Sequence, residues 1–277
     1  MLISFTKMHG TGNDFCVIDS TRQRFEATPA LLEKLTHRRF GVGCDQVLVV
    51  EAASQNDVDF NYRIFNSDGS EVGQCGNGSR CLAVFVAEQG LSDKRKLRVR
   101  TATSVLEIER LDQEQVRVNM GAPRLEPADI PFLEPSRNLH YQREIEGQSV
   151  EFGALSMGNP HLVLRVNDVD SAPVETLGPL LESHPDFPEH VNVGFLETLS
   201  RDEARLRVFE RGAGETLACG SGACAAMVMA RLWNQLGERA TIHVRGGKLL
   251  LEWAGDDAPV MMTGPAETVF KGEFEWN

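Results

Sequence analysis

Two short loops of the chain each carry a cysteine followed by a glycine, a small polar residue and a second glycine. They read VGQCGNGSRC at residues 72–81 and TLACGSGAC at residues 216–224. If a helix begins just after each cysteine, its dipole favours the thiolate and lowers the thiol pKa from its usual value of about 8.5 toward neutrality. The glycines allow close backbone approach, and the free N–H groups form an anion cradle. Each loop therefore suits proton transfer beside a carboxylate.

Two such loops suggest a reaction on both faces of one carbon. One thiolate would remove a proton while the other thiol donates a proton from the far side, which inverts a stereocentre. The α-hydrogen of an amino acid is very weakly acidic, so backbone N–H groups in a closed, dry cleft must stabilise the carbanion. We also expect oxidation to join Cys75 to Cys219 and to inactivate the protein reversibly.

The duplication extends beyond the loops. Cys219 follows Cys75 by 144 residues, and at this offset Glu71 matches Glu215. The other matches at this offset are Arg63 to Phe65 with Arg207 to Phe209, Asn66 with Glu210, Gly76 with Gly220, Asn77 with Ser221, and Gly78 with Gly222. With two inserted residues, Asn13 matches Asn159 and Gln46 matches Asn192. Several matches in the same order predict two copies of one folding unit, with a period too long for a solenoid.

The elements that must position the loops repeat as well. Residues 59–65 and 204–209 alternate as strands do, and further strands are predicted at 97–100, 105–109, 241–244 and 249–253. Helices are predicted to run through 82–90 and 223–237, each stopping at a glycine, and from Thr28-Pro29 to near Gly41. The expected class is α+β: two pseudo-symmetric lobes, each a mostly antiparallel sheet wrapped around a central helix. We expect residues 1–120, joined by 264–277, to form one lobe and 121–263 the other.

Composition limits the possible partners. The chain has 277 residues, 42% of them hydrophobic, and a formal net charge of −12, which argues against nucleic acid or an acidic membrane surface. The first residues do not resemble a signal peptide, and residues 217–230 fall short of the roughly 20 apolar residues of a spanning helix, so we expect a cytoplasmic protein.

The remaining cysteines and the glycine loops indicate no metal and no cofactor. Reduced thiols are expected in the cytoplasm, and the chain has no C-x-x-C pair for zinc or thioredoxin-like chemistry. Neither loop continues as a phosphate-binding loop, no dinucleotide fingerprint is present, and no lysine stands in a recognisable pyridoxal-phosphate context. Four cysteines are expected to be small buried apolar residues: Cys16, Cys44, Cys81 and Cys224.

Six motifs together resemble the diaminopimelate epimerase family over nearly the whole chain. They are HGTGNDF at 9–15, GCDQ at 43–46, NSDGSEVGQCGNGSRC at 66–81, GNPH at 158–161, VNVGF at 191–195 and ERGAGETLACGSGAC at 210–224. The resemblance implies a homodimeric enzyme that interconverts LL- and meso-diaminopimelate without a cofactor, in lysine and cell-wall precursor biosynthesis. It also implies two lobes with a central helix each.

The resemblance assigns roles residue by residue. Cys75 and Cys219 would be the acid and base, with Cys219 accepting and Cys75 donating a proton in the LL-to-meso direction. His161 and Glu210 would tune these thiols and help to hold the amine. Backbone N–H groups would hold the reacting carboxylate at Gly76, Asn77, Gly220 and Ser221, and the other substrate-binding residues would be Asn13, Gln46, Asn66, Asn159, Asn192 and Arg211. Arg211 would grip the distal carboxylate, because a guanidinium can bind it bidentately.

Two positions depart from the family pattern. Residues 101–105 read TATSV where a glycine-containing turn is expected, and Phe270 stands where a tyrosine at the dimer contact is expected.

Three alternatives to a diaminopimelate epimerase remain open. The first is a proline or hydroxyproline epimerase or a phenazine-pathway isomerase of the same fold. The second is a Cys–His hydrolase or acyltransferase that uses Cys219 and His161, and the third is a thiol-rich metal or redox protein. Loss of Cys75 would be tolerated in a hydrolase but not in a two-base epimerase.

Overall fold

A buried helix begins directly after each loop cysteine. The computed structural model describes residues 1–73, 75–112 and 115–276. In it, α2 (Gly76–Glu88) has Cys75 as its N-cap, and α4 (Gly220–Leu232) has Cys219 as its N-cap. The two helices lie in different compact units, the first formed by Met1–Asn119 with Thr263–Asn277 and the second by Met120–Met262. Both helices are present where they were predicted, and each begins directly after its cysteine, before the predicted stretches 82–90 and 223–237.

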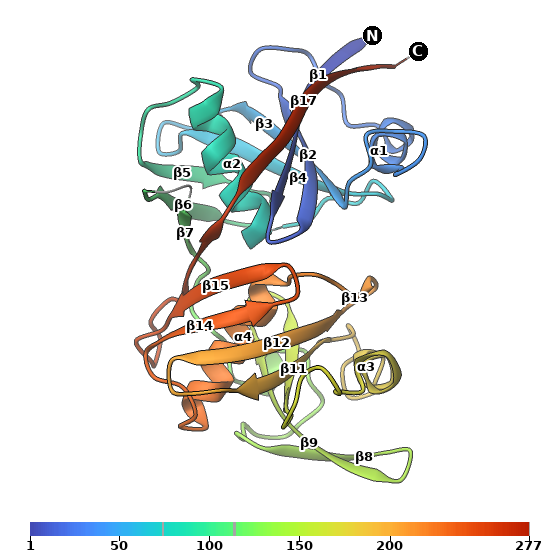
Figure 1. Ribbon diagram of the computed structural model, residues 1–277, viewed down its shortest axis with the longest axis vertical. Coiled ribbons are helices and arrows are strands. Elements are labelled where there is room, and N and C mark those ends of the chain that lie inside the picture. Colours follow the sequence, from blue (N-terminus) through green and yellow to red (C-terminus); the bar gives the residue numbers. More distant parts are fainter. Residues whose placement is uncertain (74, 113–114, 277) are drawn as a thin grey trace. The chain divides into compact units, whose positions relative to one another are not determined.

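In the first unit, α2 packs against strands from both ends of the chain (Figure 1). The strands are β1 (Leu2–Gly10), β2 (Asn13–Asp19), β3 (Gln46–Ala52), β4 (Phe60–Asn66), β5 (Lys96–Arg100), β6 (Val105–Arg110), β7 (Gln115–Asn119) and β17 (Glu267–Glu275), with β16 (Met261–Pro265) at the return of the chain. β17 pairs antiparallel with β1, so the C-terminal segment completes the sheet of this unit. A second helix, α1 (Pro29–Thr36), covers β3.

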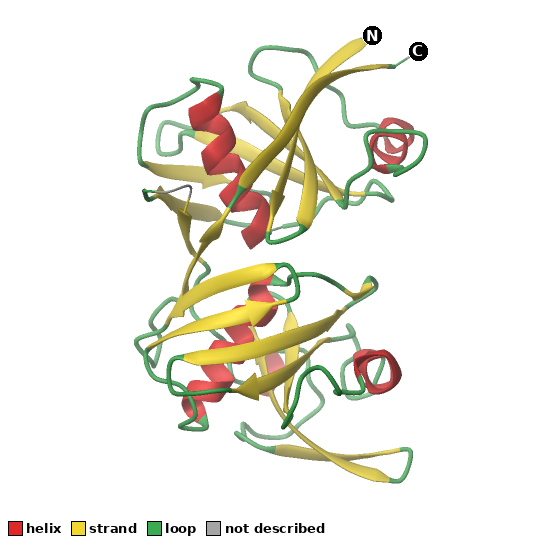
Figure 2. Cartoon of the chain, in the orientation of Figure 1, coloured by secondary structure: helices red, strands yellow, loops and turns green. Residues whose placement is uncertain are grey.

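The second unit surrounds α4 in the same way, as the helix and strand colours in Figure 2 show. Its strands are β8 (Tyr141–Ile145), β9 (Gln148–Ser156), β10 (Pro160–Arg165), β11 (Asn192–Thr198), β12 (Glu203–Glu210), β13 (Gly214–Glu215), β14 (Arg239–Val244) and β15 (Gly247–Glu252). Helix α3 (Val174–Glu182) packs on β11 and β12, and a 3-10 turn (Pro127–Asp129) precedes β8.

The two sheets share one pairing scheme. β1 to β6 pair in chain order as antiparallel, parallel, antiparallel, parallel and antiparallel. The series β9, β10, β11, β12, β14 and β15 repeats these senses. The register repeats too, since Phe15 opposes Gln46 as His161 opposes Asn192. Because a slip of one residue would turn every side chain to the other face, a shared register places equivalent side chains equivalently in each unit.

An ion pair at matching positions also shows that equivalent side chains are placed equivalently in the two units. Arg63 binds Glu71 with Nε–Oε1 and Nη2–Oε2 distances of 3.0 and 2.9 Å. Arg207 binds Glu215 in the same bidentate way, at 2.6 and 2.9 Å. Each pair ties a central strand to the segment that precedes the cysteine loop. Both arginines therefore have a structural role within their own units.

The predicted central helix of the first unit ends as expected, but two other helix ends were wrong. Gly90, with φ of 61°, follows the end of α2. α1 begins after Thr28 as predicted, yet it ends at Thr36 because His37 has extended backbone. α4 ends at Leu232, before the predicted stop at Gly237, and Asn234, with φ of 59°, takes the left-handed conformation after the helix end. Asparagine tolerates this conformation better than most residues, which is why it can end a helix without glycine.

The turn at 101–104 closes without glycine. The Thr101 and Ser104 backbones are joined by a hydrogen bond of 2.8 Å from the Thr101 N–H to the Ser104 carbonyl. The backbone N–H of Ser104 also donates to Thr101 Oγ1 at 3.1 Å, so a threonine side chain stabilises the turn. Within the described ranges, no helix is both long and apolar enough to cross a membrane.

Candidate active site

The first half of the candidate site lies at the start of α2. The Gly78 N–H donates to Cys75 Sγ at 3.4 Å, so the thiol caps the helix and lies at the positive end of its dipole. Asn77 is buried on the first turn of the same helix. A Cβ added at Gly78 would lie 2.3 Å from Tyr62 Oη, so only glycine fits between the helix and β4. Gly78 is therefore required by packing, as well as for the close approach of the backbone to a ligand.

Asn13 joins this half-site from the start of β2. Its Oδ1 lies 3.8 Å from Cys75 Sγ and accepts a hydrogen bond of 3.2 Å from Asn77 Nδ2. Gln46, on β3, donates from Nε2 to Asn66 Oδ1 on β4 at 2.9 Å, and the two residues oppose each other in the sheet. The structure therefore brings Asn13 and Asn77 to Cys75, and pairs Gln46 with Asn66 at the same end of the neighbouring strands.

The second half of the candidate site lies at the start of α4, where Cys219 is 4% exposed. Ser221 Oγ lies 3.6 Å from Cys219 Sγ. Glu210, at the end of β12, forms a hydrogen bond with the thiol and accepts a second one from Thr216 Oγ1 at 2.5 Å. The structure therefore brings two predicted site residues, Glu210 and Ser221, to Cys219.

The expectation of a lowered thiol pKa is wrong for Cys219. Burial raises its pKa well above the usual range, and the neighbouring Glu210 carboxylate raises it further. The Gly222 N–H and the Ser221 hydroxyl act in the opposite direction but do not compensate. Desolvation penalises a thiolate more than one helix end stabilises it, so Cys219 is a neutral thiol at neutral pH.

His161 is the second residue of β10 and is buried. Its Nε2 lies 3.0 Å from Asn159 Oδ1, and burial together with the Arg211 charge lowers its pKa to about 3. Burial therefore favours the neutral form of the His161 ring in the unliganded protein.

Asn192 and Arg211 complete the second half-site. Asn192 is buried opposite His161, where its Nδ2 donates to the Pro160 carbonyl at 2.9 Å and its Oδ1 accepts from the Arg211 N–H at 3.1 Å. The Arg211 guanidinium is exposed and donates from Nη1 to the Glu189 carbonyl at 2.8 Å. Asn192 thus fixes the backbone at Arg211, whose side chain extends to the surface of the unit.

Three residues beside the site were missed by sequence reasoning. Asp45 accepts from Asn13 Nδ2 at 2.7 Å, Arg80 donates to Asn77 Oδ1 at 3.0 Å, and Thr216 binds Glu210. All three lie inside the quoted motifs, at GCDQ, GNGSRC and ERGAGETLAC. A polar residue that interrupts a glycine-rich motif is the signal that could have found them.

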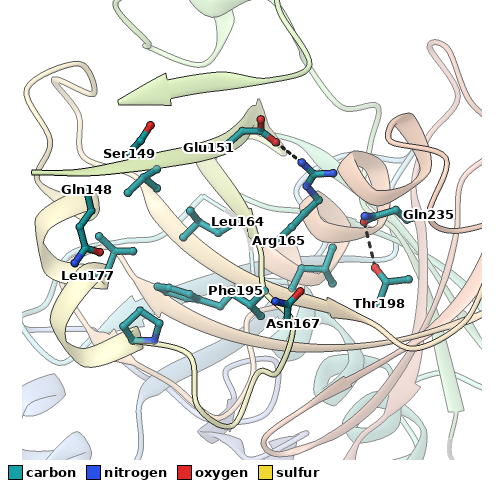
Figure 3. A pocket seen from close by; sticks show the side chains of 14 residues that line it. Gln148, Ser149, Glu151, Leu164, Arg165, Asn167, Leu177, Phe195, Thr198 and Gln235 are labelled. Carbon is teal, nitrogen blue, oxygen red and sulfur yellow. Dashed lines mark hydrogen bonds and ion pairs between the residues drawn. The ribbon is translucent and has the colours of Figure 1, made fainter. Parts of the chain in front are cut away.

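A surface hollow of about 670 Å³ in the second unit does not coincide with this site. Figure 3 shows it lined by β9, β10, β11 and α3, with an ion pair between Arg165 and Glu151 and a hydrogen bond between Thr198 and Gln235. None of the predicted site residues lines it. Among the described residues, no cluster of three or more histidine, cysteine or acidic side chains is arranged to hold a metal ion.

The fold of the chain is shared with a protein of known structure. The chain superposes on the crystal structure of a *Bacillus anthracis* phenazine biosynthesis protein of the PhzF family with a TM-score of 0.71 and 17% identity, covering 100% of both chains. At this identity the likeness shows the shared fold only.

Sequence comparison is more specific. The family pattern for diaminopimelate epimerase matches residues 5–126 and 153–269. The chain is 58% identical over 273 residues to the diaminopimelate epimerase of *Ectopseudomonas mendocina*, covering 99% of each, and 55% identical over 277 residues to that of *Thioalkalivibrio sulfidiphilus*, covering 99% of this chain and 100% of the relative. The chain belongs to the diaminopimelate epimerase family.

Proposed function

We propose that the protein interconverts LL- and meso-diaminopimelate by two-base proton transfer between Cys75 and Cys219. One observation carries the proposal: in each unit a cysteine caps a buried helix that opens with glycine, a small polar residue and glycine. Family membership supports the substrate. The shared register of the two sheets supports two equivalent approaches to one carbon.

The proton transfers balance within the two thiols. In the LL-to-meso direction, the Cys219 thiolate takes the α-proton, so that the C–H bond breaks and an S–H bond forms. The electron pair left on carbon is delocalised into the α-carboxylate, whose charge is held by the backbone N–H groups of Gly76, Asn77, Gly220 and Ser221. The Cys75 thiol then donates its proton to the opposite face, and the reverse direction exchanges the roles.

Burial of Cys219 sets a requirement on this mechanism. Its thiolate is disfavoured in the unliganded unit by desolvation and by Glu210. A substrate ammonium group beside Glu210 would offset that carboxylate, and the cradle N–H groups would stabilise the developing charge. We propose that the substrate thereby promotes formation of the base that acts on it. His161 stays neutral in this scheme and helps to position Asn159.

The rest of the site would select the substrate. Asn13, Gln46, Asn66, Asn159 and Asn192 supply amide groups, and Arg211 supplies an exposed guanidinium that suits a distal carboxylate. A proline or hydroxyproline epimerase would have no use for a distal cation. The protein uses no cofactor in this proposal, and its six free cysteines suit the reducing cytoplasm.

Solvent isotope incorporation tests the mechanism. The protein is incubated with LL-diaminopimelate in deuterated water, and α-deuterium and the meso isomer are measured by mass spectrometry and chiral chromatography. We expect the wild type to form deuterated meso product. Cys75→Ala and Cys219→Ala should each lose about 10²–10⁴-fold in kcat, the usual contribution of a general acid or base.

Two buried cysteines on the same helices provide matched controls. Cys81→Ala and Cys224→Ala remove thiols of α2 and α4 that play no part in the proposal, and both variants should keep epimerase activity. Racemisation of proline without turnover of diaminopimelate would replace the proposed substrate. Retained activity in Cys75→Ala would exclude the two-base mechanism.

A further inference from the structure

The hydroxyl group of Thr216 binds the carboxylate that lies beside Cys219. Thr216 Oγ1 donates to Glu210 Oε1 at 2.5 Å. An ionised carboxylate only accepts hydrogen bonds, and a hydroxyl has a single proton to give. The distance is typical of an O–H group that donates to a charged oxygen. The contact is therefore a charge-assisted hydrogen bond within the second half-site.

Strand pairing brings the two residues together. Glu210 ends β12, which pairs antiparallel with β13 so that Phe209 opposes Glu215. The Thr216 N–H continues this pairing with a hydrogen bond of 3.3 Å to the Val208 carbonyl. Thr216 and Glu210 are therefore diagonal neighbours on one face of the hairpin. The hairpin returns a hydroxyl to the carboxylate at the first residue of the second cysteine loop.

The first unit has a valine at the position of this threonine. At the offset of 144 residues, Val72 matches Thr216, and the Val72 N–H donates to the Ile64 carbonyl at 2.9 Å in the same pairing. The strand end carries Asn66 in place of Glu210. Valine has the shape of threonine, with a methyl group in place of the hydroxyl. The two copies therefore combine threonine with the carboxylate and valine with the amide.

The amide of Asn66 has a hydroxyl partner from another position of the hairpin. Asn66 Nδ2 donates to Ser70 Oγ at 3.1 Å, and its Oδ1 accepts from Gln46 Nε2 at 2.9 Å. Ser70 matches Gly214, which has no side chain. A hydroxyl that accepts can orient an amide, whereas a carboxylate needs one that donates. The place of the hydroxyl thus changes together with the charge of the residue that it orients.

The hydrogen bond from Thr216 favours the ionised form of Glu210. A donor to a charged group stabilises that form over the protonated one, and such a bond is stronger than one between neutral groups. A carboxylate stabilised in this way is a weaker proton acceptor and remains a partner for a cation. In the proposed function, that cation is the ammonium group of the substrate.

We propose that Thr216 is a positioning residue whose hydroxyl holds the Glu210 carboxylate ionised beside Cys219, so that it receives the substrate ammonium group instead of a proton. This inference deepens the proposed function and rests on it for the identity of the cation.

The surrounding groups allow the effect to be assigned to Glu210. Titratable or charged side chains near the hairpin are Arg207, Arg211, Glu215, Arg245, Cys219, His161, Glu182 and His190. A hydrogen bond from Arg207 lowers the pKa of Glu215, and burial lowers the pKa of His161 to about 3. Burial raises the pKa of Cys219 well above its usual range. Because the Thr216 hydroxyl donates to Glu210, a shift of the acid limb of activity on its removal reports on that carboxylate.

The hydroxyl and the methyl group of Thr216 can be removed separately. Thr216→Val removes the donor and keeps the shape, whereas Thr216→Ser keeps the donor and removes the methyl group. In both variants, kcat/KM for LL-diaminopimelate is measured between pH 5 and pH 9. Thr216→Val should lose about tenfold at pH 7, and the midpoint of its acid limb should rise by about one pH unit. Thr216→Ser should restore both values.

Thr198→Val is the matched control in the same unit. The Thr198 hydroxyl donates to Gln235 Oε1 at 3.2 Å, so its removal should leave kcat/KM and the acid limb as they are in the wild type. Equal losses in Thr216→Val and Thr216→Ser would assign the effect to the methyl group and overturn the proposal. A lower kcat/KM with an unmoved acid limb would show a structural role only and would overturn it too.

Urea unfolding at pH 7 tests the contact without a substrate. In the wild-type background, Thr216→Val should lower the folding equilibrium constant by about three- to tenfold. In the Glu210→Met background, where the acceptor is removed, the same change should have less than about a twofold effect. An equal effect in both backgrounds would show that Thr216 does not act on Glu210 and would overturn the proposal.

The two measurements distinguish this proposal from the proposed function. A wild-type protein that does not epimerise LL-diaminopimelate would overturn the proposed function, while coupling in the unfolding cycle would still support the hold of Thr216 on Glu210. Epimerisation that is unchanged in Thr216→Val would leave the proposed function and overturn the role of Thr216.

Discussion

At the scale of residues, the two thiols lie in different electrostatic surroundings although their loops match. Cys219 faces the Glu210 carboxylate, whereas Cys75 faces the neutral oxygen of Asn13. Asn66 takes the place of Glu210 in the first unit and binds Gln46 instead of a thiol. The surroundings of the two thiols are therefore chemically distinct.

Burial of His161 makes stability depend on pH. Because its pKa is about 3 in the folded state and about 6.5 in the unfolded chain, the unfolded chain takes up the proton first as pH falls. Stability is therefore lost on going from pH 7 to pH 5, by about 2 kcal/mol from this residue. Urea unfolding at both pH values should show that His161→Gln removes most of this loss.

A surface histidine of the same unit serves as the control for that measurement. His140 has a side chain that is 44% exposed, and His140→Gln should leave the pH dependence as it is in the wild type. Asp14, with its pKa of about 2, contributes only below about pH 4 and does not interfere. An equal loss of stability in the wild type and in His161→Gln would contradict the assignment.

At the scale of elements, the two central helices begin alike but pack differently. Tyr62 of β4 lies under the first turn of α2, while Leu206 of β12 holds the equivalent position in the second unit. A Cβ added at Gly78 would lie 2.3 Å from Tyr62 Oη, whereas one added at Gly222 would lie 3.2 Å from a Val208 methyl group. The start of α2 is thus packed more tightly than the start of α4.

This difference predicts unequal effects of one substitution. Gly78→Ala should lower the free energy of unfolding by about 2–3 kcal/mol through overpacking, and Gly222→Ala by about 1 kcal/mol or less. Adding Tyr62→Phe removes the clashing hydroxyl and should recover more than half of the loss in Gly78→Ala. Denaturant unfolding of the wild type, the two single glycine variants and the double variant provides the test. Similar losses of unfolding free energy at the two glycines would show that the Tyr62 contact is not what makes Gly78→Ala destabilising.

At the scale of the whole molecule, the paired strands β1 and β17 carry apolar side chains on the surface. Leu2, Val269 and Phe270 are 58%, 54% and 46% exposed, and Phe270 packs edge-on against Phe5 with ring centroids 5.9 Å apart. Exposed apolar residues gathered on paired strands favour contact with a second copy. Phenylalanine keeps the apolar surface that a tyrosine would present there and loses only its hydroxyl group.

We therefore expect a homodimer that uses this surface. Phe270→Glu should place a charge in the contact and shift the protein from dimer to monomer at micromolar concentration, as measured by sedimentation velocity. Phe40→Glu changes another phenylalanine that is 70% exposed and should leave the dimer unaffected. A wild-type monomer, or a dimer that survives Phe270→Glu, would remove this surface from consideration.

Local patterns were sufficient for the parts of the fold that depend on neighbouring residues. A helix after each cysteine loop was predicted from an apolar stretch that runs to a glycine. The matches of Arg63 with Arg207 and of Glu71 with Glu215 indicated a repeat, but the ion pairs between them were seen only in the structure. The ends of α1 and α4 were misplaced, because a helix end depends on which of several residues adopts extended or left-handed backbone once the tertiary contacts form.

The sequence by itself determined that the chain is built from two copies of one unit and that each copy offers a thiol at a glycine loop. Only the tertiary structure decided what surrounds those thiols. The hydrogen bonds from Arg80 to Asn77, from Asn77 to Asn13 and from Asn13 to Asp45 join residues of α2, of β2 and of the segment before β3. The raised pKa of Cys219 reflects burial beside Glu210. Hydrogen-bond direction and desolvation depend on which atoms meet in space, and spacing along a chain does not contain that information.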